Sequence, residues 1–331
     1  MYKKETFTAV ILFFILQICF AQSSFQNLEL GKNSLNYKGN PLKATDRKSL
    51  AFSDKGAWFG FGFLEQSEMQ GGFSGPFLMT EQNGVWLSSS FISLHLTDKN
   101  EQELIDWKTA LVNQNSYNSH LEQEFQNEKL EVKQQLVFSS GHSAIQKTSI
   151  TNRSSKTITL YPIYNSKTYL DNMQLSTEGQ FLKLVSSKSN AVGYIQFFNE
   201  GIDIVITKDS FTAKANKLTL KPNETKEIVV SQTYIFPQYD WKKENENLAK
   251  IQFNTVLKDT KKEKENQLAQ LIAKKKSIYK GAEYSIFIAK LLLTLQNNTR
   301  IPAEGLKHEG LFPSYHYEWF HGFWAWDSWK H

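Results

Sequence analysis

The chain has 331 residues, a formal net charge of +5 at pH 7 and a single cysteine, Cys19. This length allows a large hydrophobic core divided among more than one domain. Because the one cysteine lies in the N-terminal segment that precedes the first predicted domain, the mature protein is expected to contain no disulfide, catalytic thiolate or zinc–cysteine site.

The N-terminus has the pattern of a secretory signal peptide. Lys3 and Lys4 precede an apolar run from Phe7 to Phe20, and the small residue Ala21 follows. We therefore expect residues 1–21 to be removed and the mature protein to be periplasmic or secreted. The apolar run is shorter than the roughly twenty residues of a membrane-spanning helix, so no stable membrane insertion is expected after cleavage. An uncleaved anchor is the alternative.

Residues 22–236 have the composition of a β domain. Short segments rich in Val, Ile, Thr, Phe and Tyr recur between turns of Gly, Asn, Ser and Asp. Such segments over most of this range predict a large antiparallel β-sandwich. The predicted strands include Trp58–Leu64, Trp86–Leu96, Leu130–Phe138, Ala144–Thr151, Thr157–Tyr164, Gly193–Phe198, Asp203–Thr207 and Glu227–Ile235.

A glycine-rich segment, Gly71–Pro76, lies within this domain. It lacks the lysine and the following Ser/Thr of a phosphate-binding loop. We interpret it as a tight turn or bulge, because glycines flanking an aromatic residue commonly mark one.

The histidines of the β domain do not form a metal-binding pattern. His95, His120 and His142 occur singly and are predicted to be surface or turn residues. No histidine pair in the chain has the helical spacing with a neighbouring glutamate that a zinc hydrolase uses. We predict no metal site in this chain.

Residues 237–281 carry the positive charge of the protein. Between Tyr239 and Gly281 there are eleven lysines and six acidic residues, so the rest of the chain is neutral in sum. Apolar residues recur in this stretch with helical periodicity, which predicts a linker helix that opens at Asp240 and ends near Gly281. The lysines from Lys258 to Lys276 then form its solvated side, and no nucleic-acid partner is expected.

Residues 282–331 begin with a different kind of helix. Tyr284–Leu295 is apolar nearly all round, which is typical of a helix buried on most sides. Asn297, Asn298 and Pro302 are expected to stop it. The loop that follows leads into the most aromatic part of the chain.

Nine aromatic side chains crowd into the last twenty residues, around one carboxylate, Asp327. Flat rings stack on the C–H faces of sugars, and a fixed carboxylate accepts hydrogen bonds from their hydroxyl groups. The alternative is that Trp324, Trp326 and Trp329 are core aromatics and that Asp327 only caps a helix. The spacing of these residues does not separate the two interpretations.

The segment Gly322–His331 resembles the barrel-entry motif of glycoside hydrolase family 63, the processing α-glucosidases and their bacterial relatives. Gly71–Pro76 and the following Trp86-Leu87-Ser88 resemble the N-terminal domain of the bacterial members. The Trp326-Asp327 pair is shared more loosely with family 37 trehalases. The resemblance covers nearly all of the mature chain, which corresponds to the front part of such an enzyme.

This resemblance implies a mainly β N-terminal super-β-sandwich, a helical linker and the start of an (α/α)6 barrel. It implies inverting hydrolysis of α-linked glucosides or oligosaccharides, with the catalytic acid and base beyond His331. Asp327 matches the family's sugar-holding aspartate, and Phe323, Trp324 and Trp326 are its expected substrate-binding neighbours. The resemblance implies no cofactor in this chain, although calcium in the rest of the barrel is possible.

Two other functions remain open at this stage. One is a non-catalytic carbohydrate-binding sandwich with an aromatic tail, and the other is a different toroid enzyme, such as a trehalase or polysaccharide lyase. Twelve barrel helices need on the order of two hundred residues, far more than the roughly fifty that follow Gly281. We therefore expect the chain to be a fragment that is inactive by itself.

Overall fold

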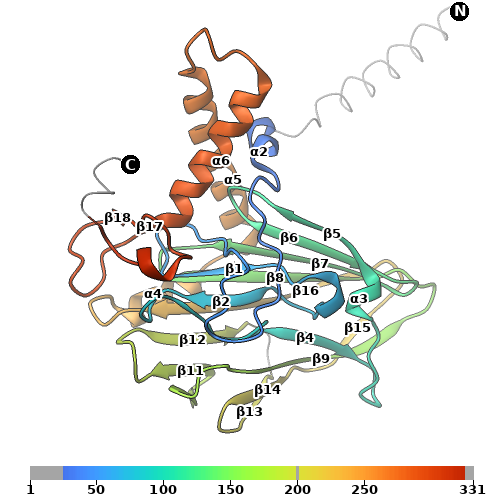
Figure 1. Cartoon of the computed structure of the whole chain (residues 1–331). Helices are drawn as coiled ribbons and strands as arrows, with labels where there is room; N and C mark the ends of the chain where they lie inside the picture. Colours follow the sequence, from blue (N-terminus) through green and yellow to red (C-terminus); the bar gives the residue numbers. More distant parts are fainter. Residues whose placement is uncertain (1–24, 199–200, 325–331) are drawn as a thin grey trace, which may run out of the picture.

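The structure, a computed structural model, describes residues 25–198 and 201–324. The predicted signal peptide, residues 1–21, lies outside the described residues. The described chain is mainly β, as the sequence predicts, with two large antiparallel sheets packed face to face and a helical hairpin beside them (Figure 1).

The larger sheet has eight strands in the order β10-β11-β12-β16-β8-β7-β6-β5. Every neighbouring pair in it is antiparallel. Its strands are β5 (Leu111–Ser116), β6 (Leu121–Gln126), β7 (Leu130–Phe138), β8 (Ser143–Asn152), β10 (Met173–Glu178), β11 (Phe181–Ser186), β12 (Val192–Phe197) and β16 (Thr225–Ile235).

The smaller sheet has five strands, β13-β14-β9-β15 with β4 paired to β9. A three-stranded sheet, β1-β2-β3, and a two-stranded one, β17-β18, complete the β structure of the described residues. These strands are β1 (Phe59–Gly62), β2 (Ser74–Leu78), β3 (Val85–Trp86), β4 (Ser93–Thr97), β9 (Ile158–Lys167), β13 (Asp203–Ile206), β14 (Ser210–Lys214), β15 (Leu218–Leu220), β17 (Thr299–Arg300) and β18 (Gly310–Leu311).

The strand predicted at Leu130–Phe138 is confirmed as β7, and its burial alternates at the start, where Leu130 and Val132 are fully buried and Glu131 and Lys133 are not. The main core contains apolar residues from all three larger sheets. At its centre the ring of Phe59 lies 5.3 Å from that of Phe138 and 4.9 Å from that of Tyr234, so β1 packs on β7 and β16.

Several strands were outside the prediction because their sequences are polar. β6 reads Leu-Glu-Gln-Glu-Phe-Gln, yet it lies between β5 and β7 in the larger sheet. Its residue Gln123 is fully buried and donates from Nε2 to Gln134 Oε1 of β7 at 2.7 Å. Buried amides that satisfy one another let a polar sequence form an interior strand.

The same amides hold the glycine-rich segment, where the interpretation as a bulge is confirmed: Gly60 pairs with Phe77 and Gly62 with Ser74, so β2 carries one extra residue at Gly75-Pro76. Gln123 Nε2 donates to the carbonyl of Gly72, and Gln134 Nε2 donates to that of Gly71, each at 3.0 Å. A Cβ on Gly71 would lie 2.1 Å from the carbonyl oxygen of Leu94. Glycine is therefore required here by close packing of backbone against backbone, and strand β2 begins two residues after Gly72, at Ser74.

The helices are α2 (Gln26–Gly31), α3 (Trp107–Ala110), α4 (Trp241–Leu248), α5 (Phe253–Ala273) and α6 (Ala282–Asn298), with short 3-10 turns η1 (Gln66–Glu68) and η2 (Glu318–Phe320). Asp240 caps α4 as predicted, because its carboxylate accepts from the backbone N–H groups of Lys242 and Lys243. The single linker helix is wrong: the chain breaks between α4 and α5, and Gly281 is the N-cap of α6 rather than a helix end.

The linker helices cover the outer face of the larger sheet. Leu248 of α4 and Phe253 and Leu257 of α5 pack on Val137 and Ile145 of β7 and β8. The lysine side of α5 is not wholly solvated, since Lys264 is buried. In the described part of the chain, no helix is both long and apolar enough to cross a membrane.

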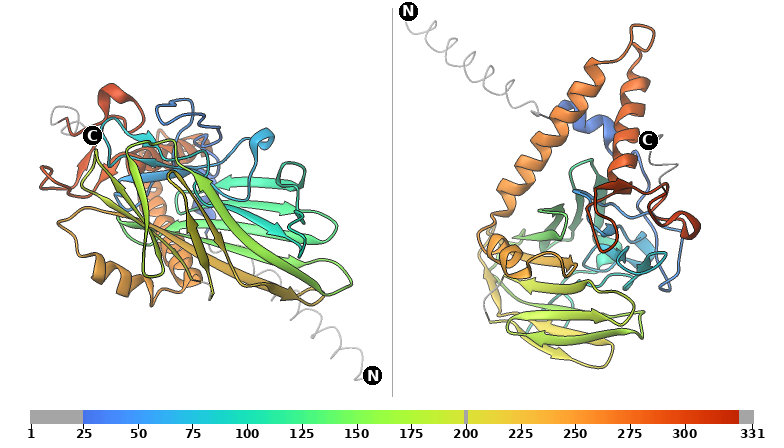
Figure 2. Two further views of the ribbon diagram at one scale, coloured as in Figure 1. Left: turned by 90° about the horizontal axis from the view of Figure 1, so that it is seen from below. Right: turned by 90° about the vertical axis from the view of Figure 1, so that its left-hand side faces the viewer.

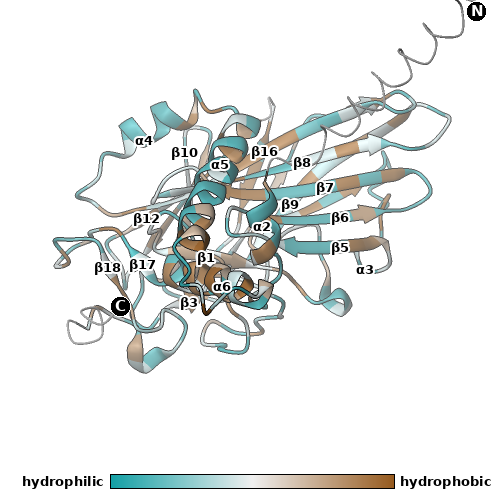
Figure 3. Ribbon diagram, turned by 90° about the horizontal axis from the view of Figure 1, so that it is seen from above, coloured by the Kyte–Doolittle hydropathy of each residue, from teal (hydrophilic) through white to brown (hydrophobic). Residues whose placement is uncertain are grey.

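Helix α6 runs antiparallel to α5, and the two project together from the sandwich (Figure 2, right). Its bounds enclose the predicted helix Tyr284–Leu295, but one side of it is uncovered: Phe287 is 57% exposed and Leu291 46%. Figure 3 shows apolar residues along α6, whereas α4 is mostly hydrophilic. The buried side of α6 consists mainly of small or polar residues, namely Ser285, Ala289, Leu293, Gln296 and Asn297.

Candidate functional site

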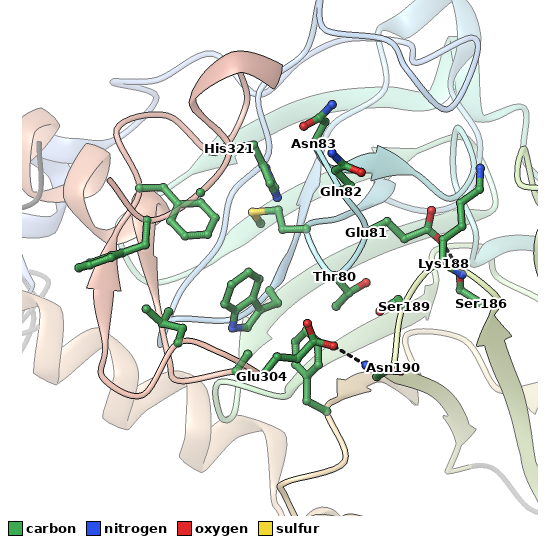
Figure 4. Close-up of a pocket in the computed structure, with 18 of the residues that line it drawn as sticks. Thr80, Glu81, Gln82, Asn83, Ser186, Lys188, Ser189, Asn190, Glu304 and His321 are labelled. Atoms are coloured by element: carbon green, nitrogen blue, oxygen red, sulfur yellow. Dashed lines mark hydrogen bonds between the residues drawn. The ribbon is translucent and has the colours of Figure 1, made fainter. Parts of the chain in front are cut away.

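An open cleft of about 660 Å³ lies where the chain after α6 returns to the sandwich (Figure 4). One side comes from the β2–β3 connection, another from the β11–β12 connection, and the third from the residues that follow α6, up to Phe323. The lining residues are Trp58, Met79, Thr80, Glu81, Gln82, Asn83, Ser186, Ser187, Lys188, Ser189, Asn190, Phe236, Ala303, Glu304, Leu306, Phe312, His321, Gly322 and Phe323.

The aromatic wall of the cleft is built around Trp58. Its indole Nε1 donates to the carbonyl of Ile301 at 3.0 Å. Its ring meets Phe236 and Phe312 edge to face, with centroid distances of 5.6 and 5.4 Å. These contacts fix three aromatic rings, one just before β1, one just after β16 and one from the C-terminal segment, and they give the cleft a preformed apolar surface.

The polar wall contains a fixed carboxylate, Glu81, whose side chain is buried. Its Oε1 accepts from the hydroxyl of Ser186 at 2.5 Å and from Nδ2 of Asn172 at 3.0 Å. A second carboxylate, Glu304, accepts from Nδ2 of Asn190 at 2.7 Å. One lysine, Lys188, also lines the cleft and lies on the same side as Glu81, so the charged groups of the cleft are few and mixed in sign (Figure 4).

His321 adds a ring that is uncharged at neutral pH. Burial lowers its pKa, and its Nδ1 lies 3.0 Å from the carbonyl oxygen of Tyr315. The imidazole also packs edge to face on Phe312, with the centroids 5.3 Å apart. The C-terminal segment is thereby held against the sandwich at the mouth of the cleft.

A fully buried arginine, Arg300, packs against the aromatic wall of the cleft and the end of α6. Arg300 donates from Nη2 to the carbonyl of Asn297 at 2.7 Å and from Nη1 to that of Thr299, at the C-terminal end of α6. Its guanidinium lies 5.7 Å from the ring centres of Phe312 and Tyr315. Burial lowers the pKa of Arg300 to about 9, which still leaves it charged at neutral pH. The negative end of the helix and the two ring faces balance that charge.

Of the predicted site residues that the structure describes, one lines the cleft and one does not. Phe323 lines the cleft and is 48% exposed. Trp324 is 50% exposed, does not line the cleft, and has its ring 6.4 Å from that of Phe320. Trp326 and Asp327 lie outside the described residues.

Sequence reasoning missed Trp58, Glu81 and Glu304 as cleft residues. Trp58 stands at the start of a predicted strand and looks like an ordinary core residue. Glu81 follows Thr80 in a polar turn. None of the three residues has a local sequence signal of a binding role, because the cleft exists only where three distant segments meet.

One of the three histidines of the β domain is placed differently from the prediction. His120, expected at the surface, is buried and stacks on Tyr117 with the rings 4.7 Å apart. Among the residues that the structure describes, no group of three or more His, Cys, Asp or Glu side chains could hold a metal ion.

Comparison with known proteins places the β domain in a class. Residues 39–192 match the family model described as "Glucosidase YgjK, N-terminal". This segment is therefore a glycoside-hydrolase-like N-terminal domain, and its matched range includes strands of all three larger sheets and the β2–β3 side of the cleft. No curated protein matched the chain.

Solved structures resemble the chain at low sequence identity, and one with a TM-score above 0.5 shows a shared fold. A protein described as a kojibiose phosphorylase from the human microbiome matches with a TM-score of 0.54 and 12% identity, over 75% of this chain and 39% of that one. An inverting mannosidase of glycoside hydrolase family 92 from Bacteroides thetaiotaomicron VPI-5482 matches with a TM-score of 0.47 and 12% identity, over 88% of this chain and 44% of that one. The chain thus spans about two fifths of the length of the first of these proteins.

Proposed function

We propose that the chain supplies the N-terminal sandwich and one wall of the sugar-binding site of an α-glycosidase. The observation that carries this proposal is the cleft, where fixed aromatic rings face fixed carboxylate, amide and hydroxyl groups within a domain of the glucosidase type. That combination suits a neutral sugar, whose C–H faces stack on rings and whose hydroxyl groups pair with polar side chains.

The residues have separate roles in this proposal. Trp58 and Phe323 offer ring faces to the sugar. Glu81 is held by Ser186 and Asn172, so it can accept a sugar hydroxyl in a set direction without moving. Asp327, with Trp324 and Trp326, is proposed to hold the reacting sugar, as the resemblance to family 63 implies.

Inverting hydrolysis of α-glucosides is the finer part of the proposal. Inversion needs a general acid and a general base that stand far enough apart for a water molecule to attack between them. We assign neither role to Glu81 or Glu304. The acid and base belong to the barrel of the whole enzyme, and the chain requires no cofactor or metal for sugar binding.

Export is proposed from the N-terminal pattern. A protein cut after Ala21 would begin at Gln22, in the periplasm or outside the cell. Intact mass measurement of protein recovered from an exporting host checks this, and retention of residues 1–21 would contradict it.

The cleft is tested by titrating the purified chain with maltotriose, using calorimetry. We expect Trp58→Ala and Glu81→Gln each to weaken binding about tenfold, which corresponds to ~1.4 kcal/mol. Trp319→Ala is the matched control, because Trp319 is 70% exposed and does not line the cleft. Equal affinity of all four proteins, or no binding by the unmodified chain, would contradict the site.

The catalytic part of the proposal has its own test. The chain by itself is expected to release no glucose from a panel of α-glucosides, because one sugar-holding carboxylate cannot act as both separated acid and base. Turnover that is abolished by Glu318→Gln would show that the catalytic pair lies in this chain. Binding without turnover would leave the non-catalytic sandwich as the competing function, and activity of a chain extended through the barrel would decide between them.

A further inference from the structure

A second cavity, of about 490 Å³, lies at one end of the five-stranded sheet. It is formed by the β3–β4 connection, the C-terminal end of β9 and the first residues of β14. It shares no lining residue with the cleft described above. We call it the serine cavity, because Ser88, Ser89, Ser90, Ser93, Ser166 and Ser210 all line it.

Strand register places a polar row along one side of the serine cavity. Asn165 of β9 pairs with Ser93 of β4 on one side and with Thr212 of β14 on the other. Directly paired residues in antiparallel strands project from the same face, so these three side chains stand side by side on adjacent strands. The sheet therefore holds an amide between two hydroxyl groups at the spacing of neighbouring strands, which is ~4.8 Å.

Part of this row has unused hydrogen-bonding capacity. Asn165 Oδ1 lies 3.2 Å from Nε2 of His95, which leaves the two amide N–H donors of Asn165 for another acceptor. Within the described part of the chain, the hydroxyl of Thr212 has no hydrogen-bond partner. Both side chains are only partly buried, so a ligand in the cavity can reach them.

Another part of the lining is a fixed set of serine hydroxyls. Ser166 Oγ lies 3.0 Å from Ser88 Oγ and donates to the carbonyl of Ser90 at 3.1 Å. The hydroxyl of Ser90 is buried and has no partner among the described residues. Held in this way, the serines form a polar wall that does not have to reorganise when a hydroxyl-bearing ligand binds.

The charge of the serine cavity excludes an ionic ligand. Of the described residues that line it, only Lys167 is charged, and its Nζ pairs with Asp209 at 2.9 Å. An apolar surface is supplied by Tyr169, whose hydroxyl donates to the carbonyl of Pro41 at 2.8 Å and so fixes the ring. Hydroxyl and amide groups beside the ring of Tyr169, without free charge, match a neutral polyhydroxylated molecule and not a phosphate or uronate.

We propose that the serine cavity binds a neutral saccharide unit, as a second carbohydrate site separate from the cleft. A glycan held at both places would be retained on the sandwich while its end occupies the cleft, since linking two weak sites raises the apparent affinity. The proposal does not depend on the catalytic function, because the two sites have no residue in common.

The test uses the full chain with Trp58→Ala and Glu81→Gln together as background, so that binding in the cleft is weakened by both substitutions. Maltotriose, mannotriose and xylotriose are each titrated, with trigalacturonate as the charged comparison. Thr212→Val removes one hydroxyl with almost no change of shape, and Asn165→Ala removes the amide. Thr219→Val on β15 is the matched control, because Thr219 is an exposed threonine of the same sheet that does not line the cavity.

We expect at least one neutral trisaccharide to bind and both cavity variants to weaken it fivefold or more, with Thr219→Val unchanged. Trigalacturonate should bind more weakly than the neutral sugars. The proposal is overturned if Thr212→Val and Asn165→Ala bind every trisaccharide as the background protein does, if none of the neutral trisaccharides binds, or if trigalacturonate binds best. Thermal unfolding of each variant confirms that a loss of binding is not a loss of fold.

Discussion

Lys264 on α5 and Asp54 in the turn before β1 form a buried ion pair, with Lys264 Nζ 2.6 Å from Asp54 Oδ1 and side-chain exposures of 6% and 1%. Their sequence neighbours form a second ion pair, in which Lys55 Nζ lies 3.3 Å from Glu263 Oε2. Helix α6 reaches the same turn, where the backbone N–H of Ser53 donates to Asn297 Oδ1 at 3.1 Å. The helical hairpin is therefore fastened to the sandwich at this turn.

Removing one member of that pair should destabilise the protein strongly. Lys264→Met leaves the carboxylate of Asp54 buried without a counter-charge, and we expect the free energy of unfolding to fall by about 3–5 kcal/mol. The double variant Lys264→Met, Asp54→Asn should recover part of this loss. Urea denaturation measures both, with the exposed Lys262→Met as control; a loss below about 1 kcal/mol for Lys264→Met would contradict the role of the pair.

Acid should destabilise the fold through His120. Burial lowers the pKa of His120 to about 4, while neighbouring groups outweigh the burial of Glu122 and lower its pKa to about 2, so Glu122 stays ionised. A histidine whose folded pKa is depressed stabilises the protein above its unfolded pKa, roughly 6.5, and this stability is lost as the pH falls toward 4. From pH 7 to pH 5 the loss is about 2 kcal/mol.

His120→Gln tests this directly, because glutamine can keep a polar contact and does not titrate. Denaturation midpoints at pH 7 and pH 5 should converge in this variant. His308→Gln is the control, since His308 is exposed and its replacement should leave the pH dependence unchanged. If the denaturation midpoints of His120→Gln still differ between pH 7 and pH 5 as they do in the unmodified protein, another group causes the loss of stability in acid.

Arg300→Met should weaken both stability and sugar binding. The substitution leaves the carbonyls of Asn297 and Thr299 without their buried donor, which costs about 1–3 kcal/mol for each group left unpaired. It also removes the cation beneath Phe312, so the aromatic wall of the cleft loses its support. Urea denaturation and maltotriose titration together check this, and full affinity in a destabilised variant would show that Arg300 does not position the wall.

The exposed side of α6 should make the chain associate. Ile286, Phe287 and Leu291 are 47%, 57% and 46% exposed, and contiguous apolar patches of this kind drive self-association. Light scattering of the chain should show a mass that rises with concentration, and Phe287→Ser with Leu291→Gln should suppress the rise. Lys290→Ser on the same helix is the control. A monodisperse unmodified chain at high concentration would contradict the prediction.

The sequence by itself determined where apolar strands and helices lie, because those signals are local. Leu130–Phe138 was bounded correctly by its composition and turns, and the apolar run Tyr284–Leu295 identified α6. The N-cap of α4 was also predictable, since Asp240 acts on the amides two and three residues ahead of it. For the aromatic C-terminal segment, side-chain chemistry alone left a sugar site and a group of core aromatics both open.

Tertiary structure decided everything that depends on distant partners. Gln123 can be buried in the interior strand β6 only because it donates to Gln134 and to the carbonyl of Gly72. Lys264 of α5 can be buried, although its neighbours are solvated, only because it forms an ion pair with Asp54 in a buried turn. The cleft joins Trp58, Glu81 and Glu304, which are separated along the chain by strands of both large sheets. No hydrophobic periodicity or sequence motif predicts that these three residues lie together. The free energy that stabilises this arrangement comes from packing between segments and not from any one segment alone.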